Sequence, residues 1–358
     1  MSLQKLDIYN VRNIRHASLN PSPKLNFIYG NNASGKSSLL EAVFILGRAR
    51  SFRTPHIKQV INFNQNELIV SGKSLQKNGN SFQLGVQADD KEVQIRINQK
   101  DFQSRHDLAY ALPIQLIDPK SYLLLDSGPQ MRREFIDWGV FNDNESFLAV
   151  WRQFKKTLKQ RNALLKTKKI SDIEVWNKEL VNYGTIVADL RLQYIKCLEP
   201  VFNAITEEFL SFETLTLNLL SGWHVSKGFK QSLADDLEKD IRYGFTHSGP
   251  HRCDFQVCID ARLAKDYVSR GQLKLLVLGL KLAQVKLLQR DQGSVGCLLI
   301  DDFTAELDLI QREKLLQLLS NLDFQVFMTA TESQEFGDIG KHLNHKVFHM
   351  KHGQVKQL

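Results

Sequence analysis

Residues 25–37 read LNFIYGNNASGKS, an apolar run followed by the motif G-x-x-x-x-G-K-S at Gly30-Asn31-Asn32-Ala33-Ser34-Gly35-Lys36-Ser37. Apolar residues then recur at helical spacing over residues 39–46, which predicts a helix directly after the motif. A strand, a glycine-bounded loop and a helix start bring free backbone amides and the positive helix end to one place. We therefore expect this loop to bind the phosphates of a nucleoside triphosphate, with Lys36 between the β and γ oxygens and Ser37 on Mg²⁺.

The second half of such a site is expected near residue 300. Cys297–Ile300 is a short apolar run typical of a buried parallel strand, and Asp301 and Asp302 follow it directly. Open α/β sheets bind ligands at the carboxyl ends of their strands. Asp301 is the candidate metal residue, while Asp302, with Lys36, is the catalytic candidate that would orient the attacking water. Paired carboxylates also cap helices or face solvent, and the upstream loop favours the functional interpretation.

A third segment, Ser269-Arg270-Gly271-Gln272, precedes an amphipathic stretch over residues 273–287. Its hydroxyl and the free amides of a helix start can bind an anion, although serine at a helix start is also ordinary capping. Because the chain's own loop already holds phosphates, we expect this segment to contact the nucleotide bound by a second copy. The order of loop, segment, paired aspartates and then Glu306-Leu307-Asp308 is the layout of ABC-type ATPases.

Composition indicates the kind of partner and the cellular location to expect. The 358 residues carry a formal net charge of +8 with a pI near 9.2, which favours a polyanionic partner such as nucleic acid. No apolar run approaches the ~20 residues that span a bilayer, and no basic-then-apolar leader opens the chain. The four cysteines form no C-x-x-C pair, so neither a zinc site nor a disulfide framework is indicated. We expect a cytoplasmic protein that does not interact with a membrane.

The chain is expected to be an α/β protein, a P-loop ABC-type ATPase head with an inserted helical lobe. Alternation over residues 82–97 predicts a hairpin that turns at Asp89-Asp90. From about residue 131 an apolar helical stripe begins, and cations share its opposite side: Arg152, Lys155, Lys156 and Lys159, with Lys166, Lys168 and Lys169 beyond. This basic face could contact phosphates or be an ordinary solvated surface. The expected division is 1–125 for the N-terminal part of the head, 126–244 for the lobe, and 245–358 for the remainder of the head.

Two further sequence strings help to identify the family that the chain resembles. Gly128-Pro129-x-x-Arg132-Arg133-x-Phe135-x-Asp137 and Gly249-Pro250-His251-Arg252 accompany the loop, the SRGQ segment and the run LLIDDFTAELD. Over essentially its whole length the chain resembles the RecF family of bacterial recombinational repair and replication-restart ATPases. The resemblance implies a head like that of SMC proteins, with a short helical lobe in place of long coiled coils. It also implies ATP-dependent homodimerisation on DNA, a preference for double-stranded and gapped DNA, and cooperation with RecO and RecR in loading RecA.

Carried over by position, the resemblance implies that residues 30–37 bind ATP and Mg²⁺ and that residues 269–272 contact the partner's γ-phosphate. Asp301 would support the metal. Asp302 stands where many ABC proteins have glutamate, and its shorter side chain favours slow hydrolysis that times the release of a clamp.

Three further positions follow from the same resemblance. Asp308 would lie at the dimer seam, and Gln115 is a candidate for the metal-sensing glutamine. No histidine follows Phe327-Met328 where ABC transporters have their switch residue, so Thr329 or Thr331 is the substitute to test.

Two other classes of protein remain as alternatives. An ABC transporter ATPase subunit predicts a shorter separation between Lys36 and Ser269 and a switch histidine. An SMC-like structural scaffold predicts heptads sustained over several turns. Neither pattern is present in the sequence.

Overall fold

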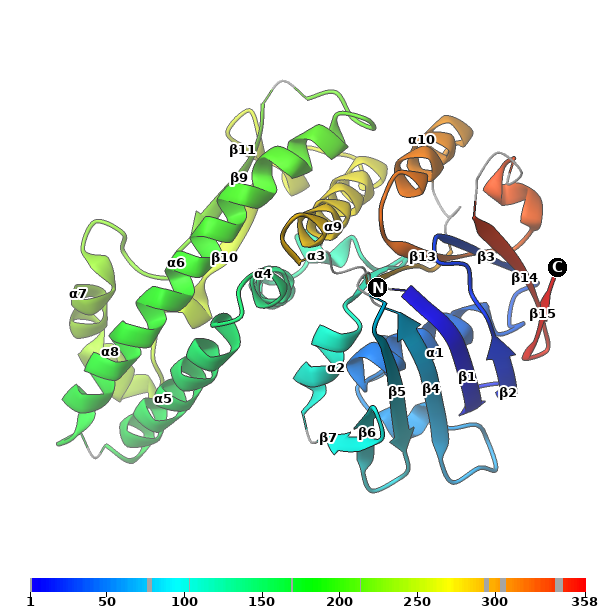
Figure 1. Cartoon of the computed structure of the whole chain (residues 1–358). Coiled ribbons are helices and arrows are strands. Elements are labelled where there is room, and N and C mark those ends of the chain that lie inside the picture. The colour runs from blue at the N-terminus through cyan, green and yellow to red at the C-terminus, as the bar shows by residue number, and fades with distance from the viewer. Residues whose placement is uncertain are drawn as a thin grey trace. The chain divides into compact units, whose positions relative to one another are not determined.

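The computed structural model describes residues 2–75, 79–102, 104–168, 170–212, 214–292, 296–302, 307–338 and 344–358. The chain forms two compact units (Figure 1). The first comprises Met1–Ser121 with Leu288–Leu358, and the second comprises Tyr122–Leu287. Lys169 of the basic face and residues 303–306 of the run LLIDDFTAELD lie outside the described part of the chain. No helix among the described residues is long and apolar enough to cross a membrane.

The first unit contains a six-stranded sheet in the order β15-β14-β3-β13-β12-β8. Its strands are β3 (Leu25–Tyr29), β8 (Ile114–Ile117), β12 (Cys297–Ile300), β13 (Gln325–Ala330), β14 (His345–Lys351) and β15 (Gln354–Gln357). All neighbours pair in parallel except β15, which is antiparallel to β14. Every residue of β12 is buried, as predicted for a central parallel strand. The carboxyl ends of β3 and β12 therefore meet at the same edge of the sheet.

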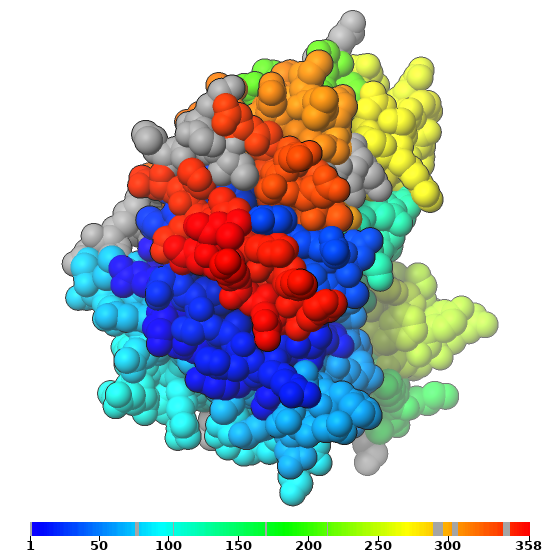
Figure 2. Space-filling view, turned by 90° about the vertical axis from the view of Figure 1, so that its right-hand side faces the viewer, coloured from blue at the N-terminus to red at the C-terminus, as the bar shows by residue number. Residues whose placement is uncertain are grey.

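A second six-stranded sheet in this unit is antiparallel, in the order β2-β1-β4-β5-β6-β7. Its strands are β1 (Ser2–Val11), β2 (Ile14–Leu19), β4 (Leu68–Leu75), β5 (Ser81–Ala88), β6 (Val93–Ile97) and β7 (Lys100–Phe102). The pairing of β5 with β6 confirms the predicted hairpin. Figure 2 shows the C-terminal residues (red) over the N-terminal strands (blue), where β15 contacts β2.

Helix α1 (Lys36–Arg48) contacts strands of both sheets and forms the centre of the first unit. Residues 38–47 are all buried, which explains why apolar side chains surround this helix rather than lining one face. Gly47 allows the close approach of β8, since a methyl group there would lie 2.5 Å from Ile114 Cδ1. The remaining elements are η1 (Ile57–Val60), α2 (Arg105–Ala111), α10 (Leu309–Ser320) and η4 (Ser333–Phe336).

The second unit combines helices with a small antiparallel sheet in the order β11-β10-β9. Its helices are α3 (Leu123–Asp126), α4 (Pro129–Asp143), α5 (Phe147–Thr167), α6 (Ile173–Thr206), α7 (Gly228–Asp235), α8 (Leu237–Tyr243) and α9 (Arg270–Gln292), the last of which continues past Leu287. The strands are β9 (Leu215–Leu220), β10 (Asp254–Ile259) and β11 (Arg262–Leu263), with η2 (Pro250–Arg252) and η3 (Ala264–Asp266). Phe154, Leu158 and Leu165 are buried, so the predicted apolar stripe of α5 is core.

The C-terminal boundary of the helical lobe differs from the expected one. Residues 245–287 were expected to belong to the ATPase head, but they are part of the second unit. The reason is non-local pairing: β10 pairs with β9 along its whole length. Arg132 of α4 also donates from Nε to Asp254 Oδ1 at 2.7 Å, and Arg191 of α6 pairs with Asp137 at 2.8 Å. The G-P-x-x-R-R-x-F-x-D string therefore supplies the ion pairs that join helices and sheet in this unit.

Candidate nucleotide site

The G-x-x-x-x-G-K-S motif forms a tight loop between β3 and α1. Gly35 precedes the helix with φ of 112° and lies close to neighbouring groups, since a methyl group there would be 2.9 Å from Met350 Cε and 3.0 Å from Asn13 Oδ1. This position therefore requires glycine. No side chain in the described chain caps α1, so the amides of its first turn are available to an anion.

Lys36 extends back along the loop. Its Nζ donates to the carbonyl oxygens of Gly30 at 2.5 Å and Asn31 at 3.2 Å. Burial lowers the pKa of Lys36, while the negative charges of Asp302 and Asp301 act in the opposite direction. The ammonium group is thus held over the loop by weak neutral acceptors, which phosphate oxygens can replace with a stronger charged pair.

Two of the three predicted metal residues, Ser37 and Asp301, meet although they lie 264 positions apart in sequence. Ser37 Oγ donates to Asp301 Oδ1 at 2.9 Å, and Thr329 Oγ1 donates to the same oxygen at 2.9 Å. Burial raises the pKa of Asp301, and these two hydrogen bonds partly oppose that rise. No group of three or more His, Cys, Asp or Glu side chains among the described residues could hold a metal alone. A hydroxyl and one carboxylate suit Mg²⁺ that takes its other ligands from phosphates and water.

Asp302 follows at the end of β12 in a left-handed conformation with φ of 55°. Its backbone N–H donates to Thr329 Oγ1 at 2.8 Å, so one threonine hydroxyl contacts both aspartates. Its side chain is exposed and lines the cavity beside the loop. Backbone of this kind is concentrated at functional sites, and here it accompanies a carboxylate that lines the cavity.

The cavity beside the loop has a volume of about 510 Å³, within the range of small-molecule sites. It is lined by Asn32–Ser38, both aspartates, Thr329, Thr331, Arg12, Asn13, Arg53 and Pro119. Gln115 is not among the lining residues. It lies in β8 beside β12, and its Oε1 accepts from the N–H of Leu116 at 3.1 Å. The metal-sensing role of Gln115 stays a prediction.

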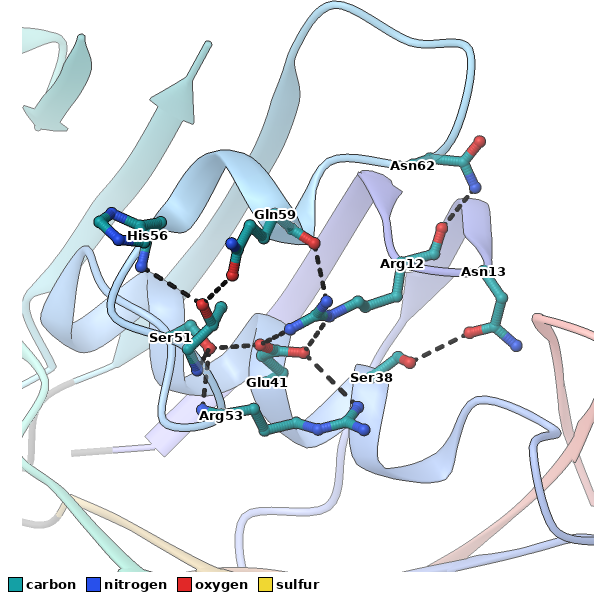
Figure 3. Close-up of polar contacts among 10 residues, drawn as sticks. Arg12, Asn13, Ser38, Glu41, Ser51, Arg53, His56, Gln59 and Asn62 are labelled. Atoms are coloured by element: carbon teal, nitrogen blue, oxygen red, sulfur yellow. Dashed lines mark hydrogen bonds and ion pairs between the residues drawn. The ribbon is translucent and has the colours of Figure 1, made fainter. Parts of the chain in front are cut away.

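Arg12 and Arg53 are lining residues that the sequence did not identify, and both contact one buried carboxylate (Figure 3). Glu41 of α1 is fully buried and accepts from Arg12 Nε and Nη2, both at 2.9 Å. Arg53 Nη1 lies 3.9 Å from the same carboxylate, and Ser51 Oγ donates to it. The available signal was the single glutamate within the otherwise apolar stretch 39–47 of the helix after the loop.

Asn13 is the third lining residue that sequence reasoning missed. Its Nδ2 donates to the carbonyl of Ala33 at 3.2 Å. Its Oδ1 accepts from Ser38 Oγ at 3.0 Å, as Figure 3 shows. On the other side of the loop, Gly353 N donates to the carbonyl of Ser34 at 2.8 Å. The loop is therefore fixed by both sheets of the first unit.

The predicted segment at residues 269–272 does begin a helix. Ser269 N donates to Gln272 Oε1 at 2.9 Å, and Gln272 N donates to Ser269 Oγ at 3.2 Å. Ser269, Arg270 and Gly271 are exposed. This reciprocal pair is ordinary capping chemistry, so a role toward a second copy's nucleotide stays a prediction. The segment belongs to the second unit, and the loop belongs to the first. Asp308 caps α10 by accepting from Gln311 N at 2.8 Å, and its place at a dimer seam is also untested.

A P-loop between a parallel and an antiparallel sheet, completed by a strand that ends in paired aspartates, defines the α/β head of an ABC-type ATPase with an inserted helical lobe. The family model described as the RecF/RecN/SMC N terminal domain matches residues 2–356. The DNA replication and repair protein RecF of Shewanella piezotolerans is 39% identical over 357 residues, covering 99% of each chain. That of Pseudomonas syringae pv. syringae is 39% identical over 362 residues, covering all of this chain and 98% of the relative. The chain belongs to the RecF family.

Solved structures agree with this assignment. The recombination mediator protein RecF with ATPrS, in the RecFOR pathway, superposes with a TM-score of 0.87 at 27% identity, covering 99% of this chain and 98% of that one. The complex of RecF with ATP gives a TM-score of 0.86 at 26% identity, covering 100% and 97%. An Smc head bound to the winged-helix domain of ScpA, at 13% identity and a TM-score of 0.61, shares the fold. The match along the whole chain does not favour a transporter subunit or a structural scaffold.

Proposed function

We propose that this protein is an ATP-dependent DNA-binding factor of recombinational repair and replication restart. The observation that carries the proposal is the contact at 2.9 Å between Ser37 Oγ and Asp301 Oδ1 beside the P-loop. It joins the two oxygen ligands that a nucleotide-bound Mg²⁺ needs from the protein. Solved relatives that bind ATP or its analogue support the same ligand for this chain.

Different residues of the nucleotide site have different roles in ATP hydrolysis. Lys36 and the amides of the first turn of α1 bind and orient the phosphates, with Arg12 and Arg53 at the edge of the cavity. Ser37 and Asp301 would hold Mg²⁺, which would neutralise charge at the phosphates. Asp302 orients water, and its short side chain makes hydrolysis slow. Slow hydrolysis suits a protein that remains bound to DNA for a set time.

We propose that two copies enclose two nucleotides, with residues 269–272 of each copy facing the nucleotide of the other. The exposure of Ser269, Arg270 and Gly271 at the start of α9 supports this arrangement. The partners we propose are double-stranded and gapped DNA, together with RecO and RecR in the loading of RecA. The net charge of +8 is consistent with a nucleic-acid partner. We place this activity in the cytoplasm.

The test of the dimer uses Ser269→Arg, with Ser146→Arg as the matched control. Ser146 is an exposed serine that precedes α5 in the same unit and has no assigned role. Sedimentation with ATP, ADP and a non-hydrolysable analogue should show ATP-dependent dimers for the wild type and for Ser146→Arg. Ser269→Arg should remain monomeric while its affinity for ATP is unchanged. Loss of ATP binding by the Ser269→Arg monomer would mean that Ser269 serves its own nucleotide.

The test of the DNA role is ATP turnover with and without gapped duplex. A repair factor should respond to the junction, whereas a transporter subunit should not. A wild-type protein that binds ATP but shows no affinity for DNA under any nucleotide condition would contradict the proposed function.

A further inference from the structure

Two exposed aromatic rings lie where α8 ends in the second unit. Tyr243 is 57% exposed and Phe245 is 38% exposed, and their ring centroids are 6.3 Å apart. The Arg242 guanidinium lies 5.7 Å from the Tyr243 ring, and that of Arg252 lies 5.5 Å from the Phe245 ring. Exposed rings flanked by cations provide a stacking surface beside positive charge.

The segment that carries the rings is held firmly in place. Thr246 donates to Asn162 Oδ1 from its backbone N at 2.9 Å and from Oγ1 at 2.7 Å. Asp240 is fully buried and accepts from His247 N at 2.9 Å and from Arg161 Nη1 at 2.7 Å. Side chains from α5 and α8 therefore fix the backbone on both sides of Phe245. A ligand that stacks on this ring would not have to order the segment first.

The contacts of Thr246 with Asn162 also place this segment beside α5, which carries a row of lysines. Along α5, Lys155, Lys159, Asn162 and Lys166 follow one another at intervals of four, three and four residues, so they lie on one side of the helix. All three lysines are exposed. Gly244 packs on the last of them, since a methyl group there would lie 3.3 Å from Lys166 Cγ. This row is part of the basic face predicted from the sequence.

His251 precedes Arg252 and contacts the carbonyl oxygen of Thr246 through Nε2 at 3.0 Å. Burial lowers the pKa of His251 to about 4, and the positive charges of Arg252 and Lys155 act in the same direction. The described residues supply no carboxylate within ion-pair distance of the five cations of this surface, which are Lys155, Lys159, Lys166, Arg242 and Arg252. Their charge is therefore available to an anion from outside the chain.

We propose that this aromatic patch, formed by Tyr243, Phe245, Arg242, Arg252, Lys155, Lys159 and Lys166, binds unpaired nucleotides of single-stranded DNA. Bases would stack on the two rings while the lysine row contacts successive phosphates. The inference rests on the proposed DNA-binding function and adds the surface that contacts the unpaired strand. Duplex DNA fits this surface less well, because its bases are already stacked on one another. Both rings also pack on His247, with centroids 5.5 Å from Tyr243 and 4.3 Å from Phe245, so bases would stack on the ring surfaces that remain exposed.

The test compares three ligands of equal length by fluorescence anisotropy: a dT oligonucleotide, an abasic oligonucleotide and a blunt duplex. The variant is Tyr243→Ala/Phe245→Ala, and the control is Tyr9→Ala, a 41% exposed tyrosine of the first unit stacked on His16 at 4.6 Å. The double variant should bind dT at least about fivefold more weakly for each ring lost. Its affinities for abasic DNA and duplex should be unchanged, as should all three affinities of Tyr9→Ala.

A second variant tests the lysine row. Lys155→Gln/Lys159→Gln/Lys166→Gln should reduce the slope of log affinity against log salt by roughly two for dT and abasic strands alike, because each lost phosphate contact contributes about 0.7. Aromatic substitution should leave that slope unchanged. Circular dichroism and retained ATP binding serve as folding controls for both variants.

Unchanged dT affinity in the aromatic variant would overturn the proposal, and the rings would then be assigned to a protein partner. Equal losses for dT, abasic DNA and duplex would also overturn it, because base stacking would not be the cause. If the wild type binds none of the three ligands, the proposed function fails as well. If it binds duplex normally while the patch variants behave as wild type, only this inference fails.

Discussion

Replacing Thr329 with valine isolates the hydroxyl that joins the two aspartates of the nucleotide site. Thr329 is fully buried, and its Oγ1 donates to Asp301 Oδ1 at 2.9 Å and accepts from Asp302 N at 2.8 Å. Valine has nearly the same shape, so packing changes little while both hydrogen bonds are lost. This is also one of the two threonines that the sequence suggested in place of a switch histidine.

The expected cost follows from these two contacts. A protein hydrogen bond contributes a net ~1 kcal/mol, so Thr329→Val should lower the free energy of unfolding by about 2 kcal/mol. Thr206→Val is the matched control, because the Thr206 hydroxyl is buried without a hydrogen-bond partner among the described residues. Removing that hydroxyl should leave stability unchanged or slightly increased. Urea titration followed by circular dichroism measures both values.

The functional consequence concerns Mg²⁺. Without Thr329, the Asp301 carboxylate keeps only the Ser37 hydroxyl as a described side-chain donor and loses one of the contacts that fix its position. Half-saturation of ATP binding should therefore require several-fold more Mg²⁺ than in the wild type, while Thr206→Val should match the wild type. A Thr329→Val protein with wild-type stability and an unchanged Mg²⁺ requirement would refute this account of the site.

Three further outcomes test other parts of the molecule. Asp302→Asn should hydrolyse ATP very slowly yet remain longer on gapped DNA than the wild type; a DNA off-rate equal to the wild-type value without hydrolysis would rule out a hydrolysis-timed clamp. Glu41→Gln should lower the free energy of unfolding by roughly 1–3 kcal/mol, less than for a fully buried pair because Arg12 is 25% exposed, and should weaken ATP binding; equal ATP affinity in calorimetry would contradict a positioning role. The neutral form of His251 should stabilise the second unit above about pH 6.5, and this contribution should be lost as pH falls toward about 4, so His251→Gln should show a shallower loss of stability over that window in urea titrations.

Local patterns predicted much of the fold and of the nucleotide site. The strand, loop and helix at residues 25–48 follow from hydrophobic spacing and two glycines. The meeting of Ser37 with Asp301 was also predictable over 264 positions, because parallel strands bring their carboxyl ends to one edge of a sheet. Each of these predictions depends on one element at a time, together with a general rule of sheet topology.

The boundary at residue 244 could not be predicted in this way. Composition does not change there, and the residues that follow resemble those of an ATPase head. What decides their place is the pairing of β10 with β9 and the ion pair of Asp254 with Arg132, 122 positions away. Pairing partners at such separations are set by the whole fold, so local patterns in the sequence did not indicate that these two segments belong together.

The contacts of the arginines at the cavity could not be predicted from local sequence patterns either. Arg12, Glu41 and Arg53 come from the end of one sheet, the central helix and a loop, and no fixed spacing links them in the sequence (Figure 3). Yet one signal was present, since a glutamate within the otherwise apolar, buried stretch 39–47 of α1 must find cationic partners or lose its charge. The partners it finds are cavity residues. The buried Glu41 carboxylate needs cationic partners, and by pairing with Arg12 and Arg53 it keeps positive charge at the nucleotide site.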